Sequence, residues 1–181
     1  MGHARCRTVG VKRLEQRWQR RWQEPAQGAV RTFRIQDAVK LRHTPQQVWR
    51  LIVPAEHGVV LSPESVARGF RVPGTPEGLG EQQCFVDLDG NTSIHEVIAY
   101  EEARYAVTRM ISPPRPAEVR ATHRLEPLGE GCILSIGMEF DAPADTTWPQ
   151  DQQDEWRRGA SRYLERVRLT LTVETPDEPP A

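Results

Sequence analysis

The segment from Gln150 to Val173 has the apolar spacing of one long amphipathic helix, and this segment limits the folds open to the chain. Its acidic residues fall in the first turns and its arginines further on, an order that the helix dipole favours. About 24 helical residues measure about 36 Å, which is long enough to cross a whole sheet. The residues that recur at helical spacing are Trp156, Ala160, Tyr163, Leu164, Val167 and Leu171.

The chain before this helix has the pattern of strands separated by turns. Asp89-Gly90-Asn91 lies between two strand-like runs, and Asp-Gly in that place predicts a hairpin. Cys132 to Phe140 alternates apolar and polar residues, as a strand with one buried face does. Thr44 and Pro45 predict the start of a short helix after the first strand. The expected strands are 32–42, 65–72, 81–88, 92–100, 104–111, 118–125 and 132–140.

This order predicts an α+β domain in which a curved antiparallel sheet of about seven strands wraps the long C-terminal helix. A sheet needs one covered face, and only the last helix is long enough to cover it. A wide sheet coils as it twists, which leaves an apolar space at its concave face, the usual form of a small-molecule site. We expect the domain to span 32–174, with a disordered acidic, proline-rich tail at 175–181.

Composition narrows the class of protein. The chain has 181 residues, a formal net charge of −1 and three cysteines, Cys6, Cys84 and Cys132, without CxxC spacing. Such cysteines indicate neither a disulfide framework nor a zinc site and favour a reducing compartment. No apolar run approaches the roughly 20 residues that span a bilayer, and the N-terminus lacks an apolar secretory signal. We therefore predict a cytoplasmic protein without stable membrane insertion, metal, cofactor or nucleic-acid partner.

Residues 1–31 form a basic N-terminal extension, which we expect to be partly helical or disordered. Val11, Leu14, Trp18 and Trp22 have the spacing of one helical stripe among arginines. One interpretation is a surface helix or a frayed leader. The other is a basic amphipathic contact for a protein partner, an acidic surface or nucleic acid. The net charge of the whole chain argues against nucleic acid.

Four stretches resemble the START-like, Bet v 1-like superfamily, also called SRPBCC, and particularly its bacterial polyketide cyclase/dehydrase-like and lipid-transfer-like members. They are 43–52, 72–81, 96–105 and 124–134, and the likeness covers about 32–173. The resemblance implies a helix-grip fold, a hydrophobic pocket between sheet and C-terminal helix, and no obligatory cofactor. It supplies no catalytic residue that can be transferred by position, and a fold of this kind hosts carriers as well as enzymes.

Strand and helix faces give the candidate site residues. His123 shares a strand face with Val119 and Ala121, and it is either a general acid or base in the pocket or a histidine that hydrogen-bonds a neighbour. Arg109 shares a face with Tyr105 and either holds a substrate oxyanion or forms an exposed salt bridge. These three, His123, Arg109 and Tyr105, are the catalytic candidates. The predicted pocket residues are Val86, Leu88, Val119, Ala121, His123, Leu134, Ile136, Met138, Trp156, Ala160, Tyr163, Leu164 and Val167.

Two aromatic residues of the predicted C-terminal helix, Trp156 and Tyr163, could contact a ligand. Trp156 either stacks on a flat ligand or belongs to the core. Tyr163 is the better pocket candidate, because a buried hydroxyl needs a partner. The sequence contains no P-loop and no GxSxG motif. The leading hypothesis is therefore noncatalytic binding of a small hydrophobic molecule, such as a lipid or polyketide. The alternatives are a polyketide cyclase or dehydratase and a protein-interaction module that uses the basic N-terminal segment.

Overall fold

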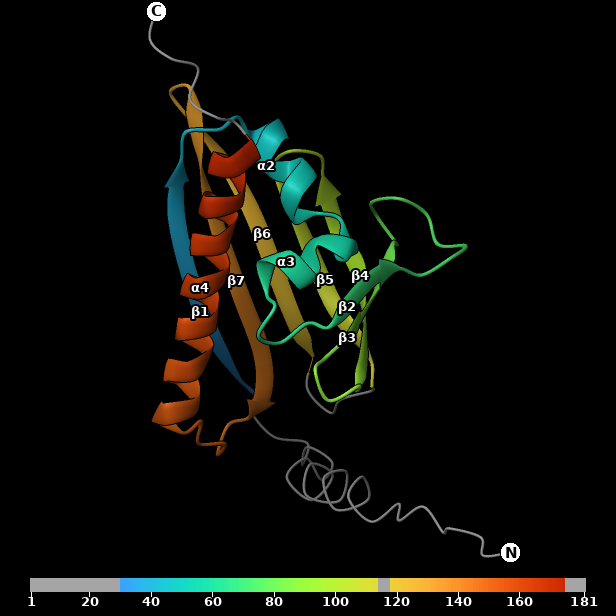
Figure 1. Cartoon of the computed structure of the whole chain (residues 1–181). Coiled ribbons are helices and arrows are strands. Elements are labelled where there is room, and N and C mark those ends of the chain that lie inside the picture. Colours follow the sequence, from blue (N-terminus) through green and yellow to red (C-terminus); the bar gives the residue numbers. More distant parts are fainter. Residues whose placement is uncertain (1–29, 114–117, 175–181) are drawn as a thin grey trace, which may run out of the picture.

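The computed structural model describes residues 30–113 and 118–174, and their main element is a seven-stranded antiparallel sheet with a long helix on its concave side (Figure 1). The predicted basic extension and acidic tail lie, apart from 30–31, outside the described residues. The elements in chain order are β1 (Val30–Leu41), α2 (Pro45–Ile52), the 3-10 helix η1 (Ala55–His57), α3 (Gly58–Leu61), β2 (Arg68–Arg71), β3 (Gln82–Val86), β4 (Thr92–Glu101), β5 (Tyr105–Ser112), β6 (Val119–Leu128), β7 (Gly131–Pro143) and α4 (Gln150–Glu174). The α+β class, the strand number and the long C-terminal helix are confirmed.

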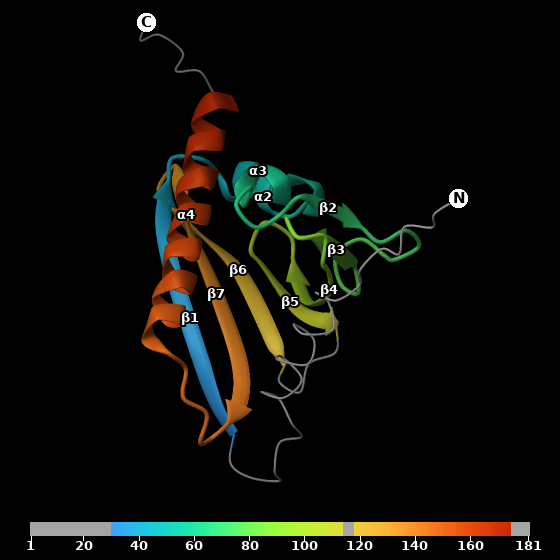
Figure 2. The same ribbon diagram turned by 60° about the horizontal axis from the view of Figure 1, so that its bottom comes forward.

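The sheet has the strand order β1-β7-β6-β5-β4-β3-β2. Strands β2 to β7 therefore form a meander, and its last strand, β7, pairs with β1, which forms one edge of the sheet. Strand β1 pairs with β7 over its whole length, from Val30 opposite Pro143 to Leu41 opposite Cys132. Helix α4 lies over β1 and β7, while α2 and α3 lie beside α4 at one end of the sheet (Figure 2). The concave face of the central strands is consequently left to other side chains or to open space.

Helix α2 begins as its sequence predicts. Thr44 is the N-cap, its hydroxyl accepts a hydrogen bond from the Gln47 backbone N–H at 3.4 Å, and Gln47 Oε1 accepts one from the Thr44 N–H at 2.9 Å. This reciprocal pair is a capping box, and Pro45 occupies the first turn, where no backbone N–H is required. The buried face of the helix consists of Val48, Trp49, Leu51 and Ile52.

The hairpin between β6 and β7 is tighter than the sequence pattern predicts. We expected strands over 118–125 and 132–140, but Pro127 continues β6 opposite Cys132, and only Gly129 and Glu130 lie between the strands. Proline is tolerated there because the pairing of β5 with β6 ends at Tyr105 and Arg124. The Leu125 N–H still bonds the Arg104 carbonyl at 2.7 Å, but at Pro127 no described strand pairs with β6 on its β5 side, so the missing N–H removes no ladder bond.

The core occupies the end of the sheet where α2, α4, β6 and β7 converge. Leu134, Val48 and Val167 have no exposed surface there, and Leu164 is also buried. Burial of a leucine or valine side chain stabilises the fold by about 1.5–3 kcal/mol. Since this end is closed by packed side chains, a ligand site in the concave face must lie toward the opposite end of α4.

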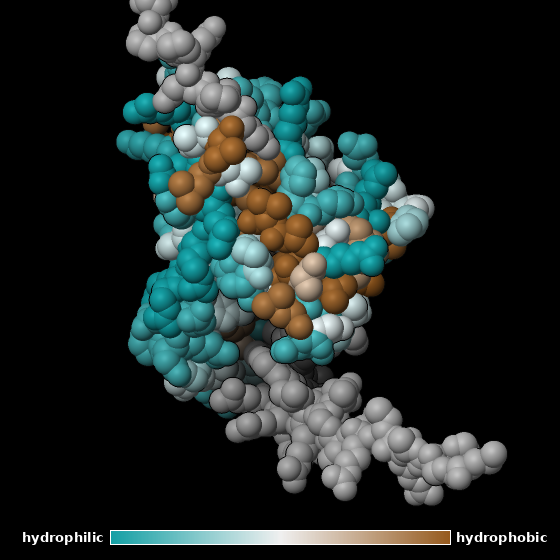
Figure 3. All heavy atoms as spheres, viewed as in Figure 1, coloured by the Kyte–Doolittle hydropathy of each residue, from teal (hydrophilic) through white to brown (hydrophobic). Residues whose placement is uncertain are grey.

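An apolar strip crosses the surface of α3 and the C-terminal turns of α4 (Figure 3). Its exposed residues are Val59 and Val60 of α3 and Leu169 and Val173 of α4. The same turns of α4 bury Val167 and Leu171 in the core, so α4 is apolar on two faces at this end. No helix among the described residues is long and apolar enough to span a membrane.

Candidate functional site

The concave face of the sheet borders an open cavity of about 1940 Å³. Its lining is mostly apolar and comes from the central strands, from α4 and from the segment between α2 and β2. Ligand sites in proteins typically measure about 300–1,000 Å³, so this cavity has room for a long chain or several rings. Exposed Asp89 and Asn91 of the β3–β4 hairpin line it together with exposed Trp156 of α4, so the cavity opens to solvent at this end.

Small residues on the inner face of the sheet create this space. Successive residues of a strand face opposite sides, and the inward set of β5 is Ala106, Thr108 and Met110. Ala121 of β6 and Gly137 of β7 line the cavity beside them. Because Ala106 and Ala121 each carry only one side-chain carbon, the concave surface stays hollow under α4.

Eight of the predicted pocket residues line the cavity. They come from β3, β6, β7 and α4, which the curvature of the sheet brings around one space. These residues are Val86, Ala121, His123, Ile136, Met138, Trp156, Ala160 and Tyr163.

Five predicted pocket residues do not line the cavity. Leu134, Leu164 and Val167 face the correct side, but they are fully packed in the core at the closed end. Leu88 lies beyond the end of β3 and is 61% exposed, because the inward row of this strand has the opposite phase to the predicted one. Val119 stands at the start of β6 opposite Phe140, outside the lining.

The inward row of β3 was missed by the sequence analysis. Glu81, Gln83 and Phe85 line the cavity, and the first two are buried polar residues. Glu81 Oε1 accepts a hydrogen bond from Gln83 Nε2 at 2.8 Å, and its Oε2 accepts one from the Gly78 N–H at 3.2 Å. The alternation had put apolar Cys84 inward, and no feature of this short strand indicates that its polar face is the enclosed one.

His123 of β6 and Tyr163 of α4 meet across the cavity, with ring centroids 5.6 Å apart. Among the described residues neither side chain has a hydrogen-bond partner, so their polar atoms remain available to a ligand or water. Burial penalises the charged imidazolium and lowers the pKa of His123 to about 4. Burial likewise raises the pKa of the Tyr163 hydroxyl. At neutral pH the pair is uncharged, and it can both donate and accept hydrogen bonds.

The catalytic candidates Arg109 and Tyr105 lie on the convex face of β5, which corrects their predicted place in the pocket. They alternate with Ala106 and Thr108, which line the cavity. Arg109 Nη2 instead forms an ion pair with Glu96 Oε2 of β4 at 2.8 Å. Of the three catalytic candidates, only His123 reaches the cavity.

Replacement of Arg109 by alanine should therefore leave ligand binding unchanged. The Arg109 side chain is 42% exposed and that of Glu96 is 28% exposed, so solvent screens the pair and its loss should cost less than about 1 kcal/mol. Thermal unfolding and titration with a ligand of the wild-type protein would measure both effects. A tenfold loss of affinity in a folded Arg109→Ala variant would contradict this placement.

Aromatic rings brace the start of α4 at the open end. Trp148 packs edge-on against Phe140 at 4.6 Å and against Phe33 at 5.4 Å between ring centroids. Trp156 lies 6.2 Å from Trp148, lines the cavity and is 38% exposed. Trp148 is thus the packed residue, whereas Trp156 lies at the rim of the cavity and not in the core, so its stacking on a flat ligand stays a prediction.

The described residues include two free thiols but no cluster of metal-binding side chains. Cys84 and Cys132 are free and buried, and burial raises the pKa of the Cys132 thiol, which disfavours its nucleophilic form. Within the described ranges, no group of three or more His, Cys, Asp or Glu side chains is placed to hold a metal ion. The polar chemistry of the cavity therefore rests on side chains such as His123, Tyr163, Glu81 and Gln83.

Comparison with known proteins agrees with this architecture. A family profile described as polyketide cyclase/dehydrase and lipid transport matches residues 32–173. A search of curated protein sequences finds no match. Among solved structures, Ara h 8.0201 is 15% identical with a TM-score of 0.60, and the match covers 80% of this chain and 99% of that one.

Two further structures have the same fold at similarly low identity. XoxI from Bacillus cereus is 16% identical with a TM-score of 0.59, and the match covers 78% of this chain and 98% of that one. A norcoclaurine synthase point mutant from Thalictrum flavum, in complex with a transition-state analogue, is 12% identical with a TM-score of 0.60, covering 82% and 99%. The chain therefore belongs to the polyketide cyclase/dehydrase and lipid transport family, in the START-like, Bet v 1-like superfamily with the helix-grip fold.

Proposed function

We propose that this protein binds a small hydrophobic molecule, such as a lipid, a polyketide or a similar metabolite, in the cavity between the sheet and α4. The observation that carries the proposal is the large, mostly apolar cavity with the uncharged pair His123 and Tyr163 inside it. Each Å² of apolar ligand surface removed from water contributes about 25 cal/mol, so apolar walls supply affinity. The family description, which includes lipid transport, supports the same class of ligand.

Hydrogen bonds to His123 and Tyr163 would orient a bound ligand, which contacts with apolar walls alone do not. A purely apolar ligand that displaces water from this pair would leave polar groups without a partner, at a cost of about 1–3 kcal/mol for each group. A ligand hydroxyl, phenol or carbonyl group at this place would satisfy one or both side chains. We therefore expect a ligand that is apolar along most of its surface and carries a hydrogen-bonding group.

The Tyr163→Phe variant tests this orientation. Decanol, an apolar chain that ends in one hydroxyl, serves as the probe, and its affinity is measured by displacement of a fluorescent dye such as Nile red. Loss of one hydrogen bond of about 1 kcal/mol should weaken decanol binding about fivefold, while decane binding changes little.

Tyr105→Phe is the matched control, because it removes the same hydroxyl from the convex face of β5. It should leave the affinity for decanol unchanged. Equal decanol affinity in wild type and Tyr163→Phe would remove Tyr163 from the binding site. If native mass spectrometry and thermal shifts across a library of lipids and aromatic compounds detect no ligand at all, the proposed function fails.

A second candidate function is cyclisation or dehydration of a polyketide-like substrate, and one observation favours it. His123 and Tyr163 converge in the cavity, and a neutral imidazole can accept a proton from a substrate. A pKa of about 4 makes His123 a weak base, so binding without turnover remains our first proposal. A His123→Ala variant that keeps ligand affinity but loses product formation would establish the enzyme.

We also propose that the protein works in the cytoplasm. Cys84 and Cys132 are free thiols, as is usual in reducing compartments. Fluorescence microscopy of the tagged full-length chain in its own cells would test this location.

A further inference from the structure

The charged residues that line the cavity are predominantly acidic. They are Glu64, Glu81, Asp87, Asp89, Glu155 and Arg162. Arg162 pairs with Glu64 at 3.2 Å and with Glu155 at 3.0 Å, and Arg158 also pairs with Glu155 at 2.8 Å, so these two carboxylates are compensated. For Glu81, Asp87 and Asp89, no ion pair exists within the described part of the chain. The cavity therefore presents an uncompensated negative charge to its contents.

Two of these carboxylates stand at the ends of one row along β3. Glu81, Gln83, Phe85 and Asp87 alternate on the cavity side of this strand. Six residues of extended chain span about 20 Å, so the row connects the interior with the exposed β3–β4 hairpin. The Asn91 side chain donates to Asp87 at 2.9 Å and lowers the pKa of that carboxyl, which keeps the outer end of the row ionised.

The inner end of the row is the more unusual environment. Glu81 is only 6% exposed, and its hydrogen bonds come from two neutral donors, the Gly78 N–H and the Gln83 amide. A buried carboxylate without a cation is costly, and a cation that enters the cavity would lower this cost.

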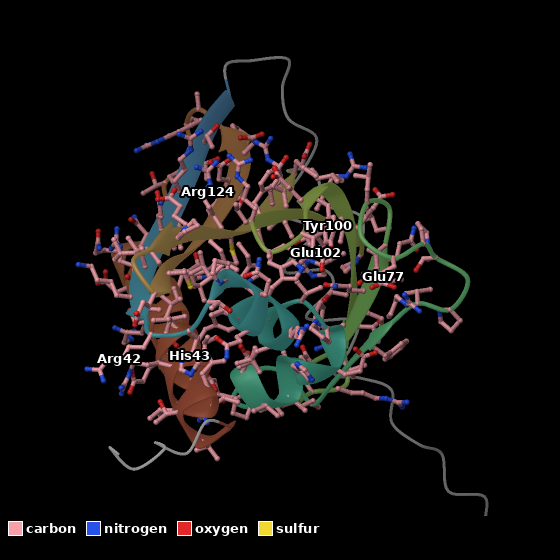
Figure 4. The ribbon with its side chains drawn as sticks, turned by 90° about the horizontal axis from the view of Figure 1, so that it is seen from above. Arg42, His43, Glu77, Tyr100, Glu102 and Arg124 are labelled. Atoms are coloured by element: carbon pink, nitrogen blue, oxygen red, sulfur yellow. The ribbon has the colours of Figure 1, made fainter. Side chains whose placement is uncertain are left out.

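Aromatic surface accompanies Glu81. The Tyr100 ring, which lines the cavity, lies against Gly78, where an added Cβ would come within 3.1 Å of the ring. Viewed from above, Tyr100 lies near the β2–β3 loop that carries Glu77, and far from Arg42 and His43 at the end of β1 (Figure 4). Phe85 adds a second ring on the same row as Glu81. A carboxylate combined with aromatic faces is an arrangement that attracts ammonium groups.

We infer that the cavity selects a hydrophobic ligand that carries a protonated amine, and that Glu81 binds the ammonium group. This inference rests on the proposed function and specifies the class of its ligand. The carboxylates Asp87 and Asp89 at the opening attract a cation toward the cavity, and Glu81 and the Tyr100 ring hold it inside. Ligands that end in a carboxylate or phosphate are repelled by the same charges.

Three probes with one apolar chain test the inference, namely decylamine, decanol and decanoate. Their affinities for the full-length protein are measured by dye displacement at pH 7 and low ionic strength. We expect decylamine to bind at least tenfold more tightly than decanol, and decanoate to bind more weakly than decanol. Equal affinities for amine and alcohol, or tightest binding of decanoate, overturn the inference but leave the proposed function intact. Failure of all three probes to bind overturns the proposed function itself.

Glu81→Gln should abolish the preference for decylamine and keep the affinity for decanol within about threefold, since it removes charge at nearly constant volume. Glu130→Gln is the matched control, because Glu130 is exposed in the β6–β7 turn and does not line the cavity. A persistent amine preference in folded Glu81→Gln overturns the role of Glu81. Should that variant fail to fold, the order of the three probes on the wild-type protein still decides the inference.

Discussion

Gly69→Ala is expected to lower the free energy of unfolding by about 3 kcal/mol, the upper end of the usual cost of overpacking. A Cβ at Gly69 would lie 1.9 Å from the carbonyl oxygen of Ala55 and 2.8 Å from its carbonyl carbon. These are backbone atoms of η1, so no side-chain rotation can relieve the overlap. Urea unfolding followed by tryptophan fluorescence measures the loss.

The same substitution should also weaken ligand binding. Ala55 lines the cavity, and a displacement of η1 away from β2 moves this part of the wall. Gly137→Ala is the matched control, because it makes the same change within a strand of the sheet and an added Cβ there meets nothing closer than 3.8 Å. We expect Gly137→Ala to change the free energy of unfolding by less than about 1 kcal/mol. Equal stability of the two variants would contradict the close approach of β2 and η1.

The fold was predictable because its signals are local. Asp89-Gly90 specifies the β3–β4 hairpin, Thr44 and Pro45 specify the start of α2, and the apolar spacing of the last segment specifies α4. The position of β1 beside β7 was not predicted, because pairing of Val30 with Pro143 joins residues more than a hundred positions apart. Periodicity within a segment carries no information about such a partner.

On β7 the sequence predicts which face of the strand points inward, but not how far along the strand the cavity extends. On β7 the alternation put Leu134, Ile136 and Met138 on one face, and all three do face inward. Leu134 nevertheless belongs to the packed core, whereas Met138, four residues further along the same strand, lines the cavity. The curvature of the sheet sets this depth, and it arises from all seven strands together.

On β3 and β5, the alternation of residues alone does not determine which face of the strand borders the cavity. Sequence reasoning assigns the apolar set to the interior, which on β3 means Cys84 and Val86. A ligand cavity reverses this preference, since its wall tolerates buried polar groups such as Glu81 and Gln83 that bond to each other. Arg109 was a plausible pocket residue for the same reason, and only its partner Glu96 on β4 reveals the outward face.

The largest pH effect should come from His123. Its pKa is about 4 in the folded protein and about 6.5 in an unfolded chain, where the imidazole is solvated. Between these values the unfolded state binds a proton that the folded state does not, so stability falls as the pH falls. Relative to its value above about pH 7, the free energy of unfolding falls by about 2–3 kcal/mol at pH 4.5, and this loss levels off below pH 4.

The His123→Gln variant isolates this effect, because glutamine is polar but does not titrate. Free energies of unfolding are measured for wild type and variant at pH 7 and pH 4.5, and the carboxylates that titrate in both proteins cancel in the difference. The wild type should lose about 2–3 kcal/mol more than the variant over this interval. Equal losses would mean that water in the cavity solvates the imidazolium. His123 would then be charged at mildly acidic pH, and the preference of the cavity for cations over anions should weaken there as well.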